Sequence, residues 1–346
     1  MKLLLLFLFS IFSLLALVIP VKYKYRYVLF SFLGFILVMV ASLRSEVGNP
    51  DYPVYRLLYE DAKTGGAIVE LSYVYFSHLI SFIFGDFFYL ILTYACLAIY
   101  FKLLAIRQVT ELLFLSLAVY VSYFFILHEM IQIRVGVASA FLLLCVKPIY
   151  DRNLKKFLFF FFLAVFFHVS SLIILPLWFL GKFKGKLNII FLILMVPVSY
   201  CIYFINVTIL NFIPIPYVQE KLDIYMQLQE LEAADFLTKI NVFNYVFVGK
   251  IFIFYFLLYK HKLLTDNNKY TMILLNIYAL SLFMYPALAM MPVLAGRISE
   301  FFGAVEIILI PFLYYIIRPR YIAVILILVW SLGILMVNLF KSNLLG

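Results

Sequence analysis

Charged side chains and cysteines are both scarce in this sequence of 346 residues, in which Asp, Glu, Lys and Arg together make up only 13%. The three cysteines are odd in number, lack metal-ligand spacing and lie inside apolar runs, so we interpret them as packing residues. The sequence also lacks a phosphate-binding glycine loop, a Gly-x-Ser-x-Gly nucleophile motif, a His-Glu-x-x-His pair and an Asp-x-Asp pair. These absences exclude the familiar signatures of nucleotide hydrolysis, serine hydrolysis and zinc proteolysis, and we expect no metal and no organic cofactor.

Apolar residues dominate what is present. They make up 67% of the chain, and the mean hydropathy is +1.11, whereas soluble globular proteins are about half apolar and a quarter charged. The net charge of +10 would indicate nucleic-acid binding in a soluble protein, but here the basic residues fall mostly in short gaps between apolar runs, which is typical of membrane-topology signals. The sequence therefore predicts an all-α, polytopic integral membrane protein without a nucleic-acid partner.

The first apolar run, residues 3–19, resembles a signal peptide but lacks a small-x-small cleavage site and is followed by Lys22, Lys24 and Arg26. We interpret it as a retained span. The positive-inside rule places that basic cluster in the cytoplasm and the N-terminus outside.

About 11 transmembrane spans follow from the lengths of the apolar runs. The run 87–105 leads inward to Lys102 and Arg107, while the shorter run 71–84 is predicted to be an interfacial or re-entrant helix on the outer side. The full set of predicted spans is 3–19, 27–43, 87–105, 112–127, 131–146, 157–180, 187–205, 242–259, 270–289, 298–317 and 321–340.

Residues 157–180 are flanked by basic clusters at both ends. A single crossing would leave one cluster outside, so we predict a broken, re-entrant hairpin with its break near His168, where a His or Ser can cap a new helix. The whole chain is then one transmembrane domain, 1–346, with external loops 44–70 and 206–240 covering an outer-face cavity.

Four ionisable groups converge on the outer side in this topology: Arg44, Arg134, His168 and Arg297. Arginines facing a wet cavity predict a site for a multiply charged anion, because guanidinium groups match phosphate oxygens bidentately. The alternative is that each arginine snorkels to the lipid headgroups. The candidate catalytic bases are His168, Asp51 and Glu129, together with His128.

Lys250 and Glu306 lie at a similar depth, about 13 Å from the outer boundary, on two spans that run in the same direction. An unpaired charge at that depth is costly, so we predict a structural ion pair between them. The alternative is that each lines the substrate cavity separately.

Four segments, in this order, carry a resemblance to a known family. They are Leu-Arg-Ser-Glu-Val-Gly-Asn-Pro-Asp-Tyr (43–52), Gln-Ile-Arg-Val-Gly-Val-Ala-Ser-Ala (132–140), the run from Lys-Phe-Leu to Phe-Phe-His-Val-Ser-Ser-Leu (156–172) and Gly-Arg-Ile-Ser-Glu-Phe-Phe (296–302). This pattern resembles the EpsG-like branch of the Wzy polysaccharide polymerases. The chain departs from the family pattern in two places, since Arg134-Val135 stands where the family has Arg-Gln, and Gly48 to Tyr52 contains one extra residue.

The resemblance implies a glycosyltransferase-C-like fold in the bacterial inner membrane. It also implies a metal-independent polymerase that joins undecaprenyl-diphosphate-linked oligosaccharide repeats into O-antigen, capsule or exopolysaccharide on the periplasmic face. Arg44, Arg134 and Arg297 would bind the substrate diphosphate and stabilise its developing charge, while a base accepts the hydroxyl proton. The expected partners are the lipid-linked glycans, membrane lipids, and a chain-length regulator and a flippase of the same pathway.

Two other functions remain open from the sequence. A lipid-linked oligosaccharide flippase or exporter would also be polytopic and lined with basic residues, but would be expected to contain two pseudo-symmetric halves. A membrane acyltransferase modifying glycans would need a poised histidine with access to a cytoplasmic acyl donor, whereas the predicted site faces the other side.

Overall fold

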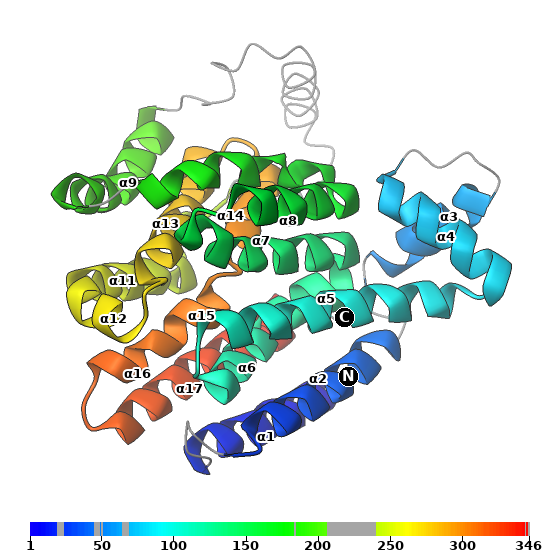
Figure 1. The fold of residues 1–346 in the computed structure, drawn as a ribbon, viewed down its shortest axis with the longest axis horizontal. Helices are drawn as coiled ribbons and strands as arrows, with labels where there is room; N and C mark the ends of the chain where they lie inside the picture. Colours follow the sequence, from blue (N-terminus) through cyan, green and yellow to red (C-terminus); the bar gives the residue numbers. More distant parts are fainter. Residues whose placement is uncertain are drawn as a thin grey trace. The chain divides into compact units, whose positions relative to one another are not determined.

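The computed structural model describes residues 1–18, 24–44, 49, 51–63, 69–182, 185–205, 240–342 and 344 (Figure 1). Within these residues the regular structure is helical, which confirms the predicted all-α class. The chain divides into two compact units, each described here by itself. The first comprises Met1–Gly181, Lys262–Thr271 and Glu306–Gly346, and the second comprises Lys182–His261 and Met272–Val305. The single-domain organisation of the whole chain stays a prediction, and residues 206–239 of the predicted external loop lie outside the described residues.

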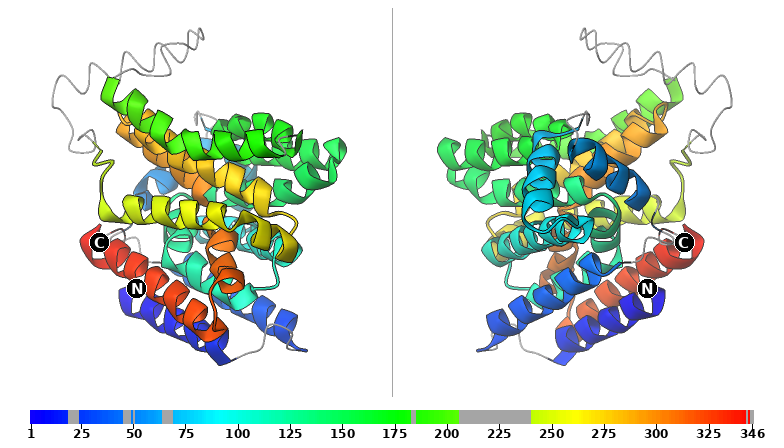
Figure 2. Two further views of the ribbon diagram at one scale, coloured as in Figure 1. Left: turned by 90° about the vertical axis from the view of Figure 1, so that its left-hand side faces the viewer. Right: turned by 90° about the vertical axis from the view of Figure 1, so that its right-hand side faces the viewer.

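The helices of the first unit follow the predicted order. Their bounds are α1 Lys2–Val18, α2 Arg26–Ser42, α3 Tyr52–Lys63, α4 Leu71–Ile83, α5 Phe87–Val109, α6 Leu113–Ser122, a π-helix Phe125–Ile131, α7 Ile133–Asp151, α8 Leu154–Phe167, a 3₁₀ helix Val169–Lys182, α12 His261–Asn267, α15 Glu306–Leu309, α16 Leu313–Ile316 and α17 Arg320–Met336, which a short π-helix extends to Lys341. Helix α5 packs against α7 and α2, and α6 packs against α1 and α17. Figure 2 shows α1 and α17 side by side.

Among the described residues, four helices are long and apolar enough to cross a membrane: Phe87–Val109, Ile133–Asp151, Lys186–Ile205 and Arg320–Lys341. The pair Leu113–Ser122 and Phe125–Ile131 makes a fifth span if its 65° bend lies within one crossing. Most of the other predicted spans correspond to apolar helices of 10–17 residues, which are short for a hydrocarbon core of about 30 Å. These lengths and compositions are those of a multi-pass membrane protein, and the count of about 11 spans stays a prediction.

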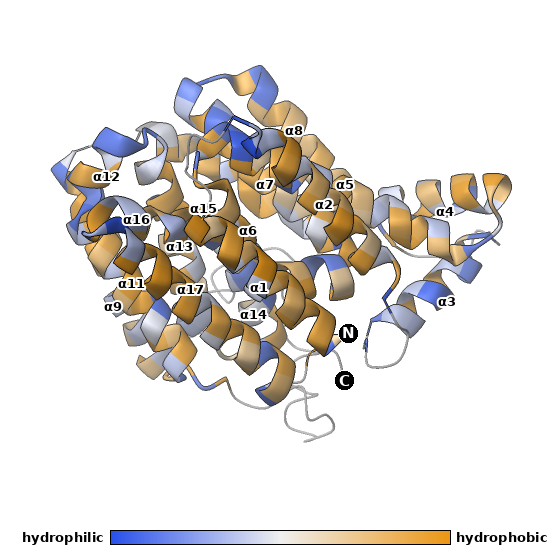
Figure 3. Cartoon of the chain, turned by 90° about the horizontal axis from the view of Figure 1, so that it is seen from below, coloured by the Kyte–Doolittle hydropathy of each residue, from blue (hydrophilic) through white to orange (hydrophobic). Residues whose placement is uncertain are grey.

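Helix α3 was not predicted, because its residues were assigned to an external loop. It is mostly hydrophilic in Figure 3, unlike the apolar α1, but one face buries Tyr55, Tyr59 and Ala62. Tyr59 and Tyr52 pack against Phe87 at the start of α5, with ring centroids 5.5 and 5.3 Å apart. These contacts attach the loop to the membrane helices.

Helix α5 contains the whole predicted span 87–105 and extends beyond it. Asp86 caps α5 by accepting a hydrogen bond from the backbone N–H of Phe88 at 2.7 Å, and the helix continues to Val109. Lys102 is therefore an interior residue of a long helix and is fully buried, rather than lying at a cytoplasmic boundary.

The connection between α6 and α7 is a buried π-helix followed by a non-helical residue, Gln132. Gly136 allows α7 to pass close to this turn, because a Cβ atom at that position would lie 2.7 Å from the His128 carbonyl oxygen. A larger residue at Gly136 would push the π-helix away from α7.

The predicted break near His168 is confirmed, and the re-entrant path of 157–180 in the membrane stays a prediction. Helix α8 ends at Phe167, and His168 adopts an extended backbone conformation before the 3₁₀ helix begins. The chain then returns to the start of α8, since Arg152 donates a hydrogen bond to the Trp178 carbonyl at 2.6 Å and its guanidinium lies 4.2 Å from the Trp178 ring. The 14 residues of α8 carry His168 about 21 Å from that end of the hairpin.

The second unit contains α9 Lys186–Ile205, α11 Tyr245–Tyr259, α13 Thr271–Ala287 and α14 Pro292–Gly303. Ser281 and Ser299 join α13 to α14 through reciprocal hydrogen bonds to each other's backbone carbonyls, 2.7 and 2.9 Å long. Tyr255 of α11 donates a hydrogen bond to the Ile193 carbonyl of α9 at 2.9 Å. Polar side chains thus link the helix pairs of this unit.

Candidate functional site

Glu70, the residue before α4, is the centre of a three-residue cluster in the first unit. One carboxylate oxygen, Oε2, forms an ion pair with Nη1 of Arg134, near the start of α7. The other, Oε1, lies 2.8 Å from Nδ1 of His168, at the break of the hairpin. The side chains of Glu70, Arg134 and His168 are 11%, 23% and 21% exposed, so the cluster is partly buried and partly in contact with solvent.

Tyrosine rings from α3 and α4 surround Arg134. Its guanidinium lies 5.4 Å from the Tyr55 ring and 6.0 Å from the Tyr73 ring. The two tyrosine rings stack on each other at 5.9 Å, and the Tyr73 hydroxyl donates a hydrogen bond to the Tyr55 carbonyl at 2.5 Å. This cation–π setting holds the guanidinium in one position while leaving its charge intact.

The charge of Glu70 and the donor and acceptor roles of the His168 ring nitrogens follow from this geometry. Burial alone would raise the pKa of the Glu70 carboxyl, but the hydrogen bond with His168 and the charge of Arg134 outweigh it, and the pKa falls below its ordinary value. Because an ionised carboxylate can only accept, Nδ1 of His168 donates to Glu70, and in the neutral imidazole Nε2 carries the lone pair. His168 is therefore set up to accept a proton at Nε2.

Arg44, which follows α2, is a buried cation beside the same tyrosines and is only 6% exposed. Its Nη1 donates to the carbonyls of Glu129 and Ala41 at 2.7 and 3.2 Å. Among the residues the structure describes, Nε and Nη2 of Arg44 have no hydrogen-bond partner. Burial lowers the pKa of Arg44 to about 10, so it stays charged at neutral pH, with Nε and Nη2 as buried donors.

Tyr55 lies close enough to Arg44 and Arg134 to interact electrostatically with both. Burial raises the pKa of the Tyr55 hydroxyl, and the charges of Arg134 and Arg44 act on it in the opposite direction. The charge of Asp51, the residue before α3, acts on both Tyr55 and Arg44. Of the sequence-predicted site residues, Arg44, Arg134, His168 and Asp51 are thus brought to this site.

Glu129, one of the predicted candidate bases, is buried away from solvent. Glu129 is 1% exposed and forms an ion pair with the fully buried Lys102, while the Tyr120 hydroxyl donates to the same carboxylate oxygen at 2.6 Å. His128 is also fully buried, and its Nδ1 lies 3.1 Å from the Ser139 hydroxyl. The backbone of this buried polar cluster is hydrogen-bonded to the site. Arg44 and Asn49 donate to the adjacent carbonyls of Glu129 and Met130.

The remaining predicted residues are divided between the units. Arg297 lies on α14 and Lys250 on α11, both in the second unit, whereas Glu306 is buried at the start of α15 in the first. The place of Arg297 in the site and the Lys250–Glu306 ion pair therefore stay predictions. In the described parts of the chain, no three His, Cys, Asp or Glu side chains form a group that could hold a metal ion.

Comparison with known proteins gives one match. The model of the EpsG family matches residues 27–345, which is most of the chain. No curated protein and no solved structure matches.

Proposed function

The chain belongs to the EpsG family of membrane proteins implicated in exopolysaccharide biosynthesis, and from this premise we propose that it is the polymerase. It joins undecaprenyl-diphosphate-linked oligosaccharide repeats into a polysaccharide on the periplasmic face of the bacterial inner membrane. The repeats are its substrate, and the flippase and chain-length regulator of the same pathway are its expected partners.

The observation that carries this proposal is the pairing of an anion site with a base. Arg44 holds two buried N–H groups without partners in the described residues, and Arg134 lies beside the same tyrosine, Tyr55. The imidazole of His168 is oriented by the carboxylate that also binds Arg134. A diphosphate needs several fixed donors, and a sugar hydroxyl needs a base, and this site provides both.

In the proposed reaction, the hydroxyl oxygen of one lipid-linked repeat forms a bond to the anomeric carbon of the growing chain. The bond between that carbon and the diphosphate oxygen breaks, and undecaprenyl diphosphate leaves with the electron pair. Nε2 of His168 accepts the hydroxyl proton, and Glu70 stabilises the resulting imidazolium. Arg44 and Arg134 stabilise the charge that develops on the leaving group, an effect worth about 3 kcal/mol per fixed donor in other enzymes.

The geometry favours His168 over the other candidate bases. Glu129 is neutralised by Lys102 and sealed from solvent, so a substrate hydroxyl could not reach it without opening the bundle. Asp51 lies within the electrostatic reach of Arg44, and we assign it to the positioning of that arginine.

Deleting the gene in its native host tests the proposal against the two other functions. We expect loss of long polysaccharide while single lipid-linked repeats persist, and restoration by wild-type protein but not by His168→Ala. Loss of every repeat at the outer face would instead show a flippase. A full-length polysaccharide lacking acyl groups would show an acyltransferase.

A further inference from the structure

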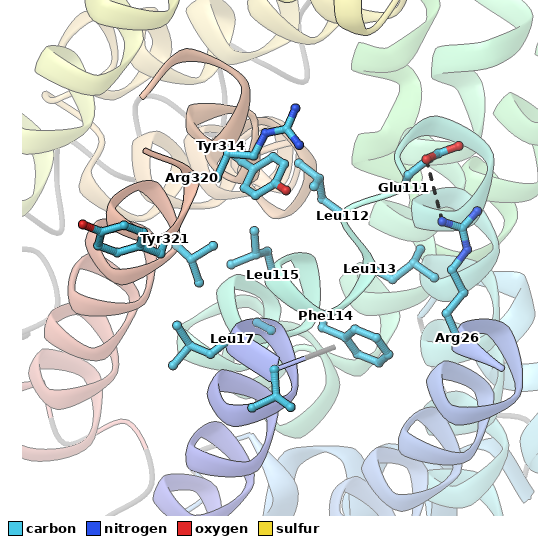
Figure 4. Close-up of a pocket in the computed structure, with 13 residues that line it drawn as sticks. Leu17, Arg26, Glu111, Leu112, Leu113, Phe114, Leu115, Tyr314, Arg320 and Tyr321 are labelled. Carbon is cyan, nitrogen blue, oxygen red and sulfur yellow. Dashed lines mark ion pairs between the residues drawn. The ribbon is translucent and has the colours of Figure 1, made fainter. Parts of the chain in front are cut away.

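A cavity of about 310 Å³ lies in the first unit, at the ends of α1, α2, α6 and α17 (Figure 4). It is lined by segments that are distant in the sequence, including Leu17, Arg26, Glu111 and Arg320. The predicted topology places the basic residues of these segments in the cytoplasm, opposite to the expected side of Glu70. The cavity is therefore distinct from the candidate site.

The charges around the cavity leave one positive charge without an opposite partner. Arg26 forms an ion pair with Glu111 at 3.7 Å. Arg320 lies over the Tyr314 ring at 5.2 Å and has no ion-pair partner among the described residues. Two guanidinium groups and one carboxylate thus give a net charge of about one, which matches a single phosphodiester.

Three helices also begin at this cavity. Arg26 is the first residue of α2, Leu113 of α6 and Arg320 of α17, and no side chain caps any of these N-termini. Uncapped N-terminal N–H groups and the helix dipole favour an anion. They add to the attraction of the arginines.

The remainder of the lining is apolar. Figure 4 shows Leu112 and Leu113 between the Arg26–Glu111 pair and the Arg320–Tyr314 pair, with Leu115, Phe114 and Leu17 below them in the view. Such a surface contributes little to binding a small hydrated anion, but stabilises hydrocarbon by about 25 cal/mol per Å² buried. The cavity therefore suits a molecule with both a phosphate and an acyl chain.

We propose that this cavity binds an anionic phospholipid of the cytoplasmic leaflet. The phosphodiester lies between Arg320 and Arg26, and the glycerol and upper acyl chain pack on the leucines. Anionic lipids are concentrated in that leaflet, where each basic residue near the surface contributes attraction. The bound lipid would link α1, α2, α6 and α17 at their cytoplasmic ends.

Binding of dioleoylphosphatidylglycerol to the purified full-length protein tests this proposal, with dioleoylphosphatidylcholine as the neutral comparison and native mass spectrometry as the readout. We expect Arg320→Gln to weaken phosphatidylglycerol binding at least fivefold, and Arg320→Gln with Arg26→Gln to weaken it further. Lys155→Gln is the matched control, because it removes an exposed positive charge on the same predicted side but away from the cavity. It should bind like the wild type.

Arg320 is exposed, so its substitution is not expected to impair folding, and thermal unfolding without lipid checks this directly. Equal binding of the two lipids, or unchanged phosphatidylglycerol binding in Arg320→Gln, would overturn the proposal. Inorganic phosphate displacing the lipid at millimolar concentration would assign the site to a small anion instead. The lipid measurement needs no polymerase activity, so its result is independent of the proposed function.

Discussion

At Glu70, a single carboxylate links two residues that lie 34 positions apart in the chain, Arg134 and His168. Each oxygen has its own partner, so the carboxylate sets the distance between the anion site and the base. Glu70→Gln retains the size of the side chain but removes the negative charge that orients His168. We expect chain extension to fall at least tenfold in Glu70→Gln while the protein remains folded, measured as polysaccharide length in the complemented deletion strain.

The lowered pKa of Glu70 also predicts a pH effect on stability. A carboxyl whose pKa is lower in the folded state than in the unfolded state stabilises the fold above its ordinary pKa, and this contribution is lost as the pH falls through the folded-state value. The thermal unfolding temperature of the wild-type protein should therefore fall at acidic pH. The fall should be smaller in Glu70→Gln. Identical acid profiles would show that the Glu70 ion pairs do not form in solution.

Arginine substitutions test whether the site needs the bidentate geometry of a guanidinium group or only its positive charge. Arg134→Ala and Arg297→Ala should abolish chain extension, and Arg134→Lys should restore little of it, since an ammonium group is a point charge without the planar fork. Polymer length and membrane insertion are measured together, with Lys63→Gln, which removes a half-exposed positive charge on α3 that pairs with Glu60, as a control. Full extension by Arg134→Lys would mean that the site needs only positive charge.

At the scale of elements, the buried pair of Lys102 and Glu129 joins α5 to the π-helix. Removing one partner leaves an uncompensated buried charge, which costs about 3–5 kcal/mol in other proteins. Lys102→Met should therefore lower the thermal unfolding temperature sharply, and Lys102→Met with Glu129→Leu should recover most of the loss. A double variant no more stable than the single one would contradict a stabilising role for the pair.

The hairpin is the second element with a direct test. In a background with Cys96, Cys145 and Cys201 replaced by serine, cysteines at positions 155 and 182 should resist an impermeant external thiol reagent, while a cysteine at position 63 reacts. This follows because Arg152 and Trp178 bring the two ends of the hairpin to one side. External labelling at position 182 would contradict the topology of every later segment.

Across the whole molecule, apolar run lengths predicted where most helices lie, and the basic clusters predicted the broken hairpin. They could not predict α3, because its hydrophilic face masks three buried residues. They could not predict the burial of Lys102 within α5 either, because a buried lysine has the same sequence signature as a boundary lysine. Glu70 was visible only as one of several loop acids. Its pairing depends on tertiary contacts that a single sequence does not contain.

The pair of Lys250 and Glu306 is a prediction from the sequence that double substitution can test. Lys250→Met should reduce expression, and Lys250→Met with Glu306→Leu should recover it if the residues pair. Membrane yield of each variant, measured beside Lys155→Gln, gives the result. Failure of the double variant to recover would assign the two residues separate roles in the substrate cavity.

The most direct test of the central claim is polymerisation by the purified protein in liposomes, supplied with undecaprenyl-diphosphate-linked repeats as its only substrate. Wild-type protein should produce a ladder of extended chains and release one undecaprenyl diphosphate per bond formed, and His168→Ala should produce neither. A well-folded wild-type protein that extends no chain, or a His168→Ala variant that extends chains at the wild-type rate, would contradict the account.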